Sequence, residues 1–204
     1  MNVTVDIVIF TIRDRRLHVL LVRRGVAPFK GRWAIPGGFV HERESLEAAA
    51  RRELREETGV ADVYLEQLYS FGDPGRDPRG RVVTIAHFAL IPSEARTPRA
   101  GTDAAEARWF RVDRAPALAF DHGRILCVAV ERLRAKLDYS SVAFGLLPER
   151  FTLTDAQRVY ETILGRRLDK RNFRRRVERL VRPLQAVRRD GRRPARLYAA
   201  RRKP

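Results

Sequence analysis

Residues 38–60 have the sequence GFVHERESLEAAARRELREETGV, and this stretch decides what the first part of the chain folds around. We expect a helix over about Ser45–Thr58 that ends at Gly59, because glycine accepts the left-handed conformation with which many helices stop. Apolar residues recur every four positions on one side of this helix, which predicts that side to be buried: Leu46, Ala50 and Leu54.

Three glutamates share a neighbouring arc of the same helix. At about 100° per residue, Glu57 lies about 40° from Glu53, and Glu56 lies about 60° to the other side. Clustered carboxylates repel each other unless a cation lies among them, and ligand sets made only of oxygen suit Mg²⁺ or Mn²⁺. The pattern therefore predicts a metal site, where the cation would neutralise a pyrophosphate and polarise a water molecule.

The residues beside the glutamates fit the same site. Arg52 can hold a carboxylate through its planar guanidinium, and Gly37 and Gly38 let the main chain approach a metal closely. The alternative is a solvated helix with Arg–Glu pairs four residues apart. The fixed positions of Gly38, Glu44 and Gly59 favour the metal site.

At every defining position this segment resembles the Nudix box, the signature of a family of metal-dependent pyrophosphohydrolases. The resemblance implies a nucleoside diphosphate linked to a further group as substrate, with Mg²⁺ or Mn²⁺ as cofactor. It implies catalytic roles for Arg52, Glu53, Glu56 and Glu57, and metal binding by Gly38, Glu53, Glu56 and Glu57. Substrate binding is expected at Gly37, Gly38 and Glu44. The general base is Glu53 or an acid outside the box, Asp103 or Glu106.

The rest of the first domain is predicted to be an α/β sandwich with a mixed sheet, over residues 1–138. Its strands are expected at residues 2–12, 17–23, 64–71, 82–91 and 107–112, and a second long helix at 121–137. That helix carries a stripe of Leu126, Val130, Leu133 and Leu137, and Cys127 in it is expected to be a core thiol. The polar loop 72–80 (GDPGRDPRG) is expected to be mobile; its prolines resemble those of ADP-ribose-cleaving Nudix proteins.

Charge divides the chain unevenly. The net charge is +17, but residues 151–204 hold 18 basic and only 5 acidic residues, a net charge of +13. Arginine-rich codon usage does not explain why acidic residues are depleted at one end only. A short and strongly basic module indicates a polyanionic partner.

This module has the element order of a winged helix. Thr154 with Gln157 is predicted to form a capping box, and Asp169 to cap a second helix with Phe173, Val177 and Leu180 inward. Asp190-Gly191 is a strong hairpin signal. We therefore expect a linker at 139–150 and a winged helix-turn-helix domain at 151–204, with a third helix drawn from 121–137 or from residues around 141–147.

Double-stranded DNA is the partner that this arrangement predicts, because the second helix of a helix-turn-helix enters the major groove. The expected contacts are Lys170, Arg171, Asn172, Arg174 and Arg175 on the helix, and Arg188, Arg189, Arg192 and Arg193 in the wing. A basic appendage for solubility or dimer formation is the alternative. RNA is less favoured, because aromatic platforms for single strands are missing.

Over nearly all its length the chain resembles Nudix-related transcriptional regulators, through the box and residues 71–92, 118–126 and 151–176. The resemblance implies a homodimer on DNA that responds to ADP-ribose or a similar metabolite. Many such regulators have eroded boxes, and this one is intact. We favour a regulator that keeps the catalytic machinery and so can consume its own effector; a hydrolase with a passive basic domain is the alternative, and a regulator that only senses the ligand stays open. With no signal peptide and no membrane span in the sequence, we expect a cytoplasmic protein with no membrane partner.

Overall fold

The strand at the centre of the molecule is β1 (Asn2–Arg13), which has a neighbour on both sides. The computed structural model describes residues 1–60, 63–92, 104–189 and 194–201. Within them, β1 pairs antiparallel with β2 (Arg16–Arg24) and parallel with β6 (Val82–Leu90). The sheet is therefore mixed, as predicted.

The remaining strands extend this sheet. β3 (Trp33–Ala34) and β7 (Ala104–Arg111) pair with β2, β4 (Gly37–Phe39) pairs with β1, and β5 (Tyr64–Phe71) pairs with β6. The predicted strand positions are confirmed to within a few residues, and the largest difference is that β7 begins three residues earlier than expected.

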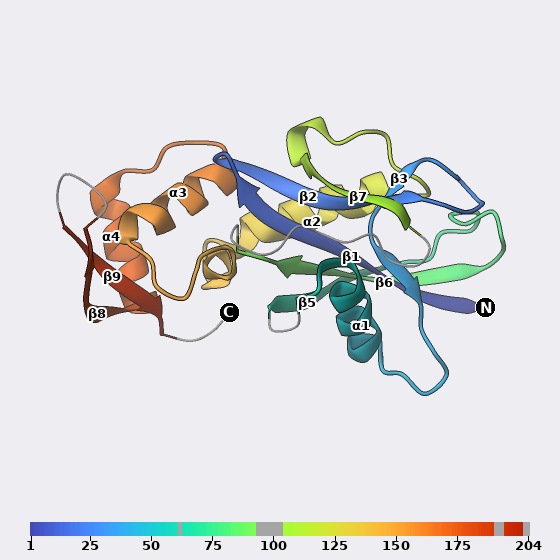
Figure 1. Cartoon of the computed structure of the whole chain (residues 1–204), viewed down its shortest axis with the longest axis horizontal. Helices are drawn as coiled ribbons and strands as arrows, with labels where there is room; N and C mark the ends of the chain where they lie inside the picture. The colour runs from blue at the N-terminus through green and yellow to red at the C-terminus, as the bar shows by residue number, and fades with distance from the viewer. Residues whose placement is uncertain (61–62, 93–103, 190–193, 202–204) are drawn as a thin grey trace.

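Two helices cover opposite faces of the sheet: α1 (Leu46–Thr58) and α2 (His122–Lys136) (Figure 1). Successive residues of a strand point to opposite faces. Val5, Ile7 and Ile9 of β1 thus share a core with α1, whereas Val8 and Phe10 share another core with α2. The predicted sandwich is confirmed.

Two expectations about these helices are wrong. Leu46 is 37% exposed because it lies at the first turn of α1, and Ala49 is buried beside Ala50 and Leu54 instead. Cys127 is exposed. Its neighbours in sequence are apolar, but each step along a helix turns the side chain by about 100°, which points Cys127 away from the stripe of Leu126 and Val130.

The C-terminal module lies at one end of the sheet (Figure 1). It contains α3 (Leu153–Leu164), α4 (Lys170–Val177) and the antiparallel strands β8 (Val181–Arg188) and β9 (Ala195–Ala200). Asp169 caps α4 as predicted, since its side chain accepts a hydrogen bond from the Asn172 amide. The 3₁₀ turn Glu178–Leu180 follows α4. The proposed turn residues Asp190 and Gly191 lie outside the described residues.

The predicted capping box was placed two residues too late. Thr152 caps α3, and its hydroxyl accepts from the Asp155 amide while the Asp155 carboxylate accepts from the Thr152 amide. Thr154-x-x-Gln157 has the same spacing. Gln157, however, donates to Glu161 and to the Leu168 carbonyl, which fixes the turn after α3.

The segment expected to be a linker, 139–150, contains the 3₁₀ helix η2 (Val142–Leu146). Its buried Phe144 packs near Phe151, with ring centres 5.2 Å apart, and near Tyr160. η2 thus supplies part of the third helical element that the winged helix needs. The core on the α2 face continues through η2 into α3 and α4. The domain boundaries at 138 and 151 stay a prediction. None of the described helices has the length and apolar composition of a membrane span.

Candidate functional site

Gly37 and Gly38 lie where no side chain fits. Gly38 on β4 pairs with Val5 of β1, and a Cβ atom added to Gly38 would lie 2.1 Å from Oε1 of Glu53. A Cβ atom on Gly37 would lie 2.2 Å from the Val5 carbonyl oxygen. Gly38 therefore lets β4 lie directly against the Glu53 carboxylate of α1, and Gly37 lets it lie directly against the main chain of β1.

Arg52 organises the carboxylates around it. Its guanidinium donates to Glu44 through Nε (2.9 Å) and Nη2 (3.0 Å), and to Oε1 of Glu53 through Nη1 (2.6 Å). Nη1 also lies 3.7 Å from Glu56, and Nη2 donates to the Phe39 carbonyl at 3.2 Å. This is the planar fork expected from the sequence, with Glu44 as the carboxylate it holds.

Burial and charge act in opposite directions on the two carboxylates. Burial raises the pKa of Glu53, and the hydrogen bond from Arg52 only partly opposes this. The pKa of Glu44 is lowered, chiefly by its hydrogen bonds from Arg52. Glu53 and Glu57 are both buried, whereas the side chain of Glu56 is half exposed. Two of the three predicted carboxylate ligands of the metal, Glu53 and Glu57, therefore lie in low-dielectric surroundings.

Gly38 lies against Glu53, and Glu56 and Glu57 follow on the same helix, but the side chains do not converge on one point. In the described part of the chain, no three His, Cys, Asp or Glu side chains converge as a metal ion requires. Glu53 points to Arg52 instead. Their oxygen donors nevertheless fit Mg²⁺ or Mn²⁺ in kind, and the space kept open by Gly38 lies against Oε1 of Glu53.

A hollow of about 150 Å³ lies beside the box glycines, and sequence reasoning missed most of its lining. Arg76 lines it and donates to both carboxylate oxygens of Asp121, at 3.0 and 2.7 Å. Its Nη2 atom lies 3.5 Å from Asp6. The loop 72–80 was expected to be mobile, but Arg76 and Asp77 in it are buried, so this expectation is wrong. The ion pairs hold the loop on the sheet.

The hollow has a cationic and aromatic character. Arg79 is paired with Asp77 at 2.7 Å and lies 5.3 Å from the ring centre of Phe39. Arg24 lies 4.9 Å from the ring centre of Phe120, which also lines the hollow. Arginines and aromatic rings together suit a phosphate that carries a planar group. The available signal in the sequence was Asp6, an acidic residue between the apolar residues Val5 and Ile7.

His122 closes the hollow at the start of α2. Its Nδ1 atom accepts a hydrogen bond from the Ile35 amide at 2.9 Å, and its Nε2 atom lies 3.7 Å from Asp6. Burial lowers the pKa of this imidazole, and accepting through Nδ1 requires that nitrogen to be unprotonated. The first turn of α2 is thus fixed to the segment between β3 and β4.

Two other acids were candidates for the base or for substrate binding. Glu106 lies on β7 and is paired with Arg108 at 2.5 Å, and Asp103 lies outside the described residues. Glu44 does not line the hollow, and its carboxylate is held by Arg52. Its geometry favours a positioning role over contact with a substrate.

The predicted DNA-contacting side of α4 is exposed. Phe173 and Val177 face the core, as expected, and five polar residues face solvent: Lys170, Arg171, Asn172, Arg174 and Arg175. Arg175 donates to Asn172 at 3.3 Å. A hollow of about 720 Å³ separates α4 from the wing, and besides Lys170 and Arg174 it is lined by Arg196 and Arg201 of the second wing strand. Those two arginines were not among the predicted contacts.

The predicted wing contacts differ among themselves. Arg188 donates to both carboxylate oxygens of Asp155, at 3.1 and 2.9 Å, so it points back toward the start of α3. Arg189 is exposed. Arg192 and Arg193 lie outside the described residues. The roles of all these side chains in DNA binding stay predictions.

Family models match both halves of this arrangement. Residues 2–128 match the NUDIX domain, and residues 143–200 match the NrtR DNA-binding winged helix domain. The chain belongs to the NrtR family of Nudix-related proteins. Both the predicted resemblance and the predicted combination of folds are confirmed.

Relatives of this NrtR-family chain carry informative names. It is 41% identical, over 96% of its length and 80% of the relative's, to the ADPR responsive transcriptional repressor NtrR of Acinetobacter baylyi. Over 53% of its length it is 43% identical to the ADP-ribose pyrophosphatase of Methanocaldococcus jannaschii, of which it covers 63%.

Solved structures of another NrtR agree with the fold. The crystal structure of Shewanella oneidensis NrtR complexed with a 27mer DNA is 40% identical, with a TM-score of 0.87 over 98% of this chain and 93% of that one. The NUDIX domain of the same protein complexed with ADP ribose is 41% identical, with a TM-score of 0.59 over 65% of this chain and 88% of that one.

Proposed function

We propose that this protein is a transcriptional regulator that binds DNA through its winged helix and responds to ADP-ribose bound beside the Nudix box. The observation that carries the proposal is that one helix, α2, begins at the hollow and ends at the DNA-binding module. The relatives support it, since one is a repressor named for its response to ADPR and another was crystallised with DNA and with ADP ribose.

The contacts at the two ends of α2 supply the route. At its start, Asp121 and His122 contact Arg76 and the Ile35 amide in the hollow. At its end, Arg134 donates to the Ile163 carbonyl of α3 at 3.1 Å. Arg176 of α4 donates to the Leu137 carbonyl and to Asp138. A ligand that moves the start of α2 therefore moves the elements that hold α3 and α4.

Linkage sets the energetic requirement for such a response. ADP-ribose must bind the DNA-competent and the DNA-free states with different affinity, and DNA then changes the affinity for ADP-ribose by the same factor. We propose that the arginines of the hollow, Arg24, Arg76 and Arg79, recognise the diphosphate, and that Phe39 and Phe120 contact a planar part of the ligand. Because the hollow is small, at about 150 Å³, the rest of the ligand extends over the box.

We further propose that the box retains pyrophosphohydrolase activity. Gly38, Glu53, Glu56 and Glu57 would hold Mg²⁺ or Mn²⁺, which supplies charge neutralisation for the pyrophosphate and an activated water. In this chain Arg52 orients Glu53 and is itself fixed by Glu44. The raised pKa of Glu53 is consistent with a carboxylate that binds a cation or takes up a proton.

A second candidate function is that of a hydrolase with a passive basic domain. The intact network of Arg52, Glu44 and Glu53 favours activity, and the pyrophosphatase relative matches only the first domain. The contacts that link α2, and the two residues after it, to α3 and α4 favour the regulator. A regulator that slowly consumes its own effector is consistent with both observations.

For DNA binding we propose a homodimer that presents α4 of each copy to the major groove. Lys170, Arg171, Asn172 and Arg174 are exposed on that helix and are the proposed base or phosphate contacts. Arg175, Arg189, Arg192 and Arg193 are proposed as further contacts.

The deciding experiment is a mobility shift on the DNA upstream of the protein's own gene, with and without ADP-ribose. The double variant Glu56→Gln/Glu57→Gln serves beside the wild type, so that hydrolysis does not remove the effector. We expect sequence-specific binding whose apparent Kd changes on the order of tenfold with ADP-ribose. If binding is sequence-specific but ADP-ribose does not change its apparent Kd, the protein is not an ADP-ribose sensor. If binding does not depend on the DNA sequence, only the proposed hydrolase activity remains.

A further inference from the structure

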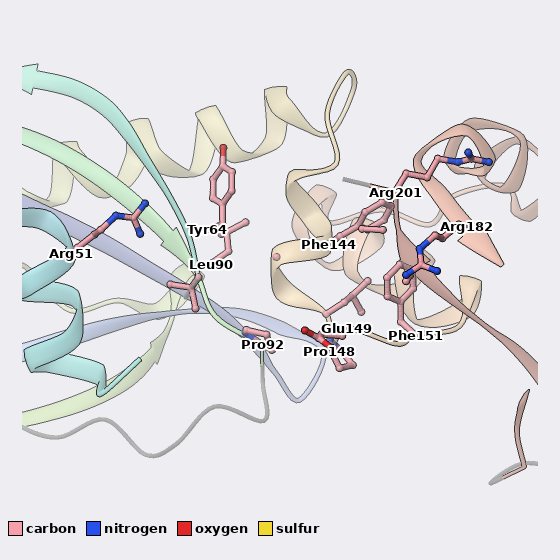
Figure 2. A pocket seen from close by; sticks show the side chains of 15 residues that line it. Arg51, Tyr64, Leu90, Pro92, Phe144, Pro148, Glu149, Phe151, Arg182 and Arg201 are labelled. Atoms are coloured by element: carbon pink, nitrogen blue, oxygen red, sulfur yellow. The ribbon is translucent and has the colours of Figure 1, made fainter. Parts of the chain in front are cut away.

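A third cavity lies between the two domains, away from the predicted metal ligands. Its volume is about 640 Å³. Figure 2 shows Tyr64 and Leu90 of the first domain on one side, and Phe144, Phe151 and Arg182 from η2 and the winged helix on the other. Of the box residues only Arg51 lines it; none of the predicted metal ligands does, and no residue lines both this cavity and the hollow with Arg76.

The inner wall of this cavity is apolar. Leu90, Phe144, Leu147 and Phe151 lie beneath it and are buried in the core. Tyr64, Pro148 and Ala200 are half-buried and give it an accessible apolar surface. The domains meet tightly at its edge. A Cβ atom on Gly145 of η2 would lie 3.2 Å from Leu90 and 3.3 Å from Tyr64.

The rim of the cavity is cationic. Among the described residues that line it, Arg51, Arg182 and Arg201 face a single acid, Glu149. Arg51 is paired with Glu47 at 2.8 Å, and Arg201 donates through Nε to the Val181 carbonyl. Arg182 on β8 is exposed, and its cross-strand partner is Ala199, which also lines the cavity.

We propose that this interdomain cavity binds a small anion with a planar apolar group, at a site distinct from the one beside the Nudix box. Its volume lies within the usual range for ligand sites, about 300–1,000 Å³, and such sites favour domain interfaces. The planar group packs against the apolar wall of the cavity, and Arg182 pairs with the anionic group.

A ligand here touches both domains, so it binds best to one arrangement of the two and stabilises that arrangement. The site is thus a second input to the DNA-binding module. This consequence rests on the proposed function, whereas the binding site itself does not.

The test uses the full chain without DNA, and ADP-ribose is added only as a competitor. The probe is 1-anilinonaphthalene-8-sulfonate, an apolar bicycle with one sulfonate, followed by fluorescence, with AMP as a competing phosphate. N-phenyl-1-naphthylamine, which lacks the sulfonate, is the uncharged comparison. We expect saturable binding of one sulfonate probe per chain, and competition by AMP that saturating ADP-ribose does not reproduce.

Two pairs of variants isolate the charge. Arg182→Ala removes the cation, and Arg179→Ala removes an exposed arginine that does not line the cavity. Ala199→Glu places a carboxylate beside Arg182, and Ala199→Gln adds the same bulk without charge. The first member of each pair should weaken sulfonate binding on the order of tenfold, with little change for the second member or for the uncharged probe.

Near-ultraviolet circular dichroism of each variant checks that the fold is kept, because a loosened core also binds such dyes. Equal sulfonate binding by all four variants, displacement by ADP-ribose, or no saturable binding of any probe overturns the proposal. A failure of the DNA mobility shift to respond to ADP-ribose bears only on the proposed function.

Discussion

Arg176 of α4 donates a hydrogen bond of 2.9 Å to Asp138, just beyond the end of α2. The same guanidinium group donates to the Leu137 carbonyl and lies 5.8 Å from the ring centre of Tyr160. The neighbouring residue in sequence, Arg175, points outward and contacts only Asn172 among the described residues. Of these two adjacent arginines, Arg175 lies on the exposed side of α4 that we propose contacts DNA, whereas Arg176 fixes α4 to the end of α2.

Arg176→Ala should weaken the coupling between ADP-ribose and DNA. We expect the ratio of DNA affinities without and with ADP-ribose to fall several-fold toward one, because typical couplings of this kind amount to about 5–150-fold. Fluorescence anisotropy of labelled DNA, titrated at fixed ADP-ribose concentrations, measures the ratio. Arg175→Ala is the matched control: it should weaken DNA binding and leave the ratio unchanged. If both variants keep the ratio of the wild type, α2 is not the coupling element.

Hydrolysis should depend on the glutamates of the box. With Mg²⁺ and ADP-ribose, the Glu56→Gln/Glu57→Gln variant should release AMP at least about a hundredfold more slowly than the wild type, because the metal loses two anionic ligands. Chromatographic quantification of AMP measures this. Glu47→Gln, which removes an exposed glutamate of the same helix that pairs with Arg51, should keep the activity. Equal inactivity of all three proteins on a broad panel of nucleoside diphosphates argues against an enzyme.

The sequence predicted the box, the sandwich and the winged helix because each depends on local patterns. Glycine spacing, apolar periodicity and turn residues are set by neighbours in the chain. The hollow beside the box is different. Asp6, Arg76 and Asp121 are brought together by the parallel pairing of β1 with β6 and by the position of α2, and no local pattern encodes such contacts.

The errors have the same origin. Cys127 looked buried because its neighbours in sequence are apolar, and loop 72–80 looked mobile because it is rich in proline, glycine and charge. In each case tertiary packing decided the outcome. Arg188 donates to Asp155, which no local pattern indicated, and its role as a wing contact stays a prediction.

Arg76→Met should destabilise the fold. The substitution leaves the carboxylates of Asp6 and Asp121 with little solvent and without their cation, and breaking a buried ion pair by removing one partner costs about 3–5 kcal/mol. Urea unfolding at pH 7 measures the loss. Arg111→Met breaks the exposed pair with Asp113 and should change the unfolding free energy far less. Similar losses in the two variants contradict a buried role for Arg76.

Stability should fall at mildly acid pH through His122. Burial lowers the pKa of this imidazole below its unfolded value of about 6.5, so the unfolded state takes up the proton first. The contribution of neutral His122 to the unfolding free energy is fully present above pH ~6.5. It is lost as the pH falls through the folded pKa, by up to about 1.4 kcal/mol per pH unit. The unfolding free energies of wild type and His122→Asn, measured from pH 7.5 to 5.5, give the difference in slope.

Asparagine at position 122 keeps an acceptor for the Ile35 amide but does not titrate. The slope should therefore be smaller in His122→Asn, whereas His41→Asn, at an exposed position, should have the slope of the wild type. Identical slopes for all three proteins exclude His122 as the source. The remaining slope of His122→Asn includes His87, whose pKa burial also lowers.

Alanine at Gly37 and alanine at Gly38 should have different effects on the protein. At Gly38 the new methyl group meets the flexible end of Glu53, so the protein should fold while Glu53 is displaced and Mg²⁺-dependent hydrolysis falls at least about tenfold. At Gly37 it meets the Val5 carbonyl of the central strand, which cannot move without the sheet, so the unfolding free energy should fall by about 1–3 kcal/mol.

Gly123→Ala is the control for both glycine variants, because its methyl group has no atom within 4 Å. It lies in the helix α2 and should stabilise the fold by up to about 1 kcal/mol. Thermal unfolding and AMP release, measured on all three variants, separate the two effects. A Gly38→Ala protein with full activity means that Oε1 of Glu53 does not need its present position, and the proposed metal site then lies elsewhere on α1.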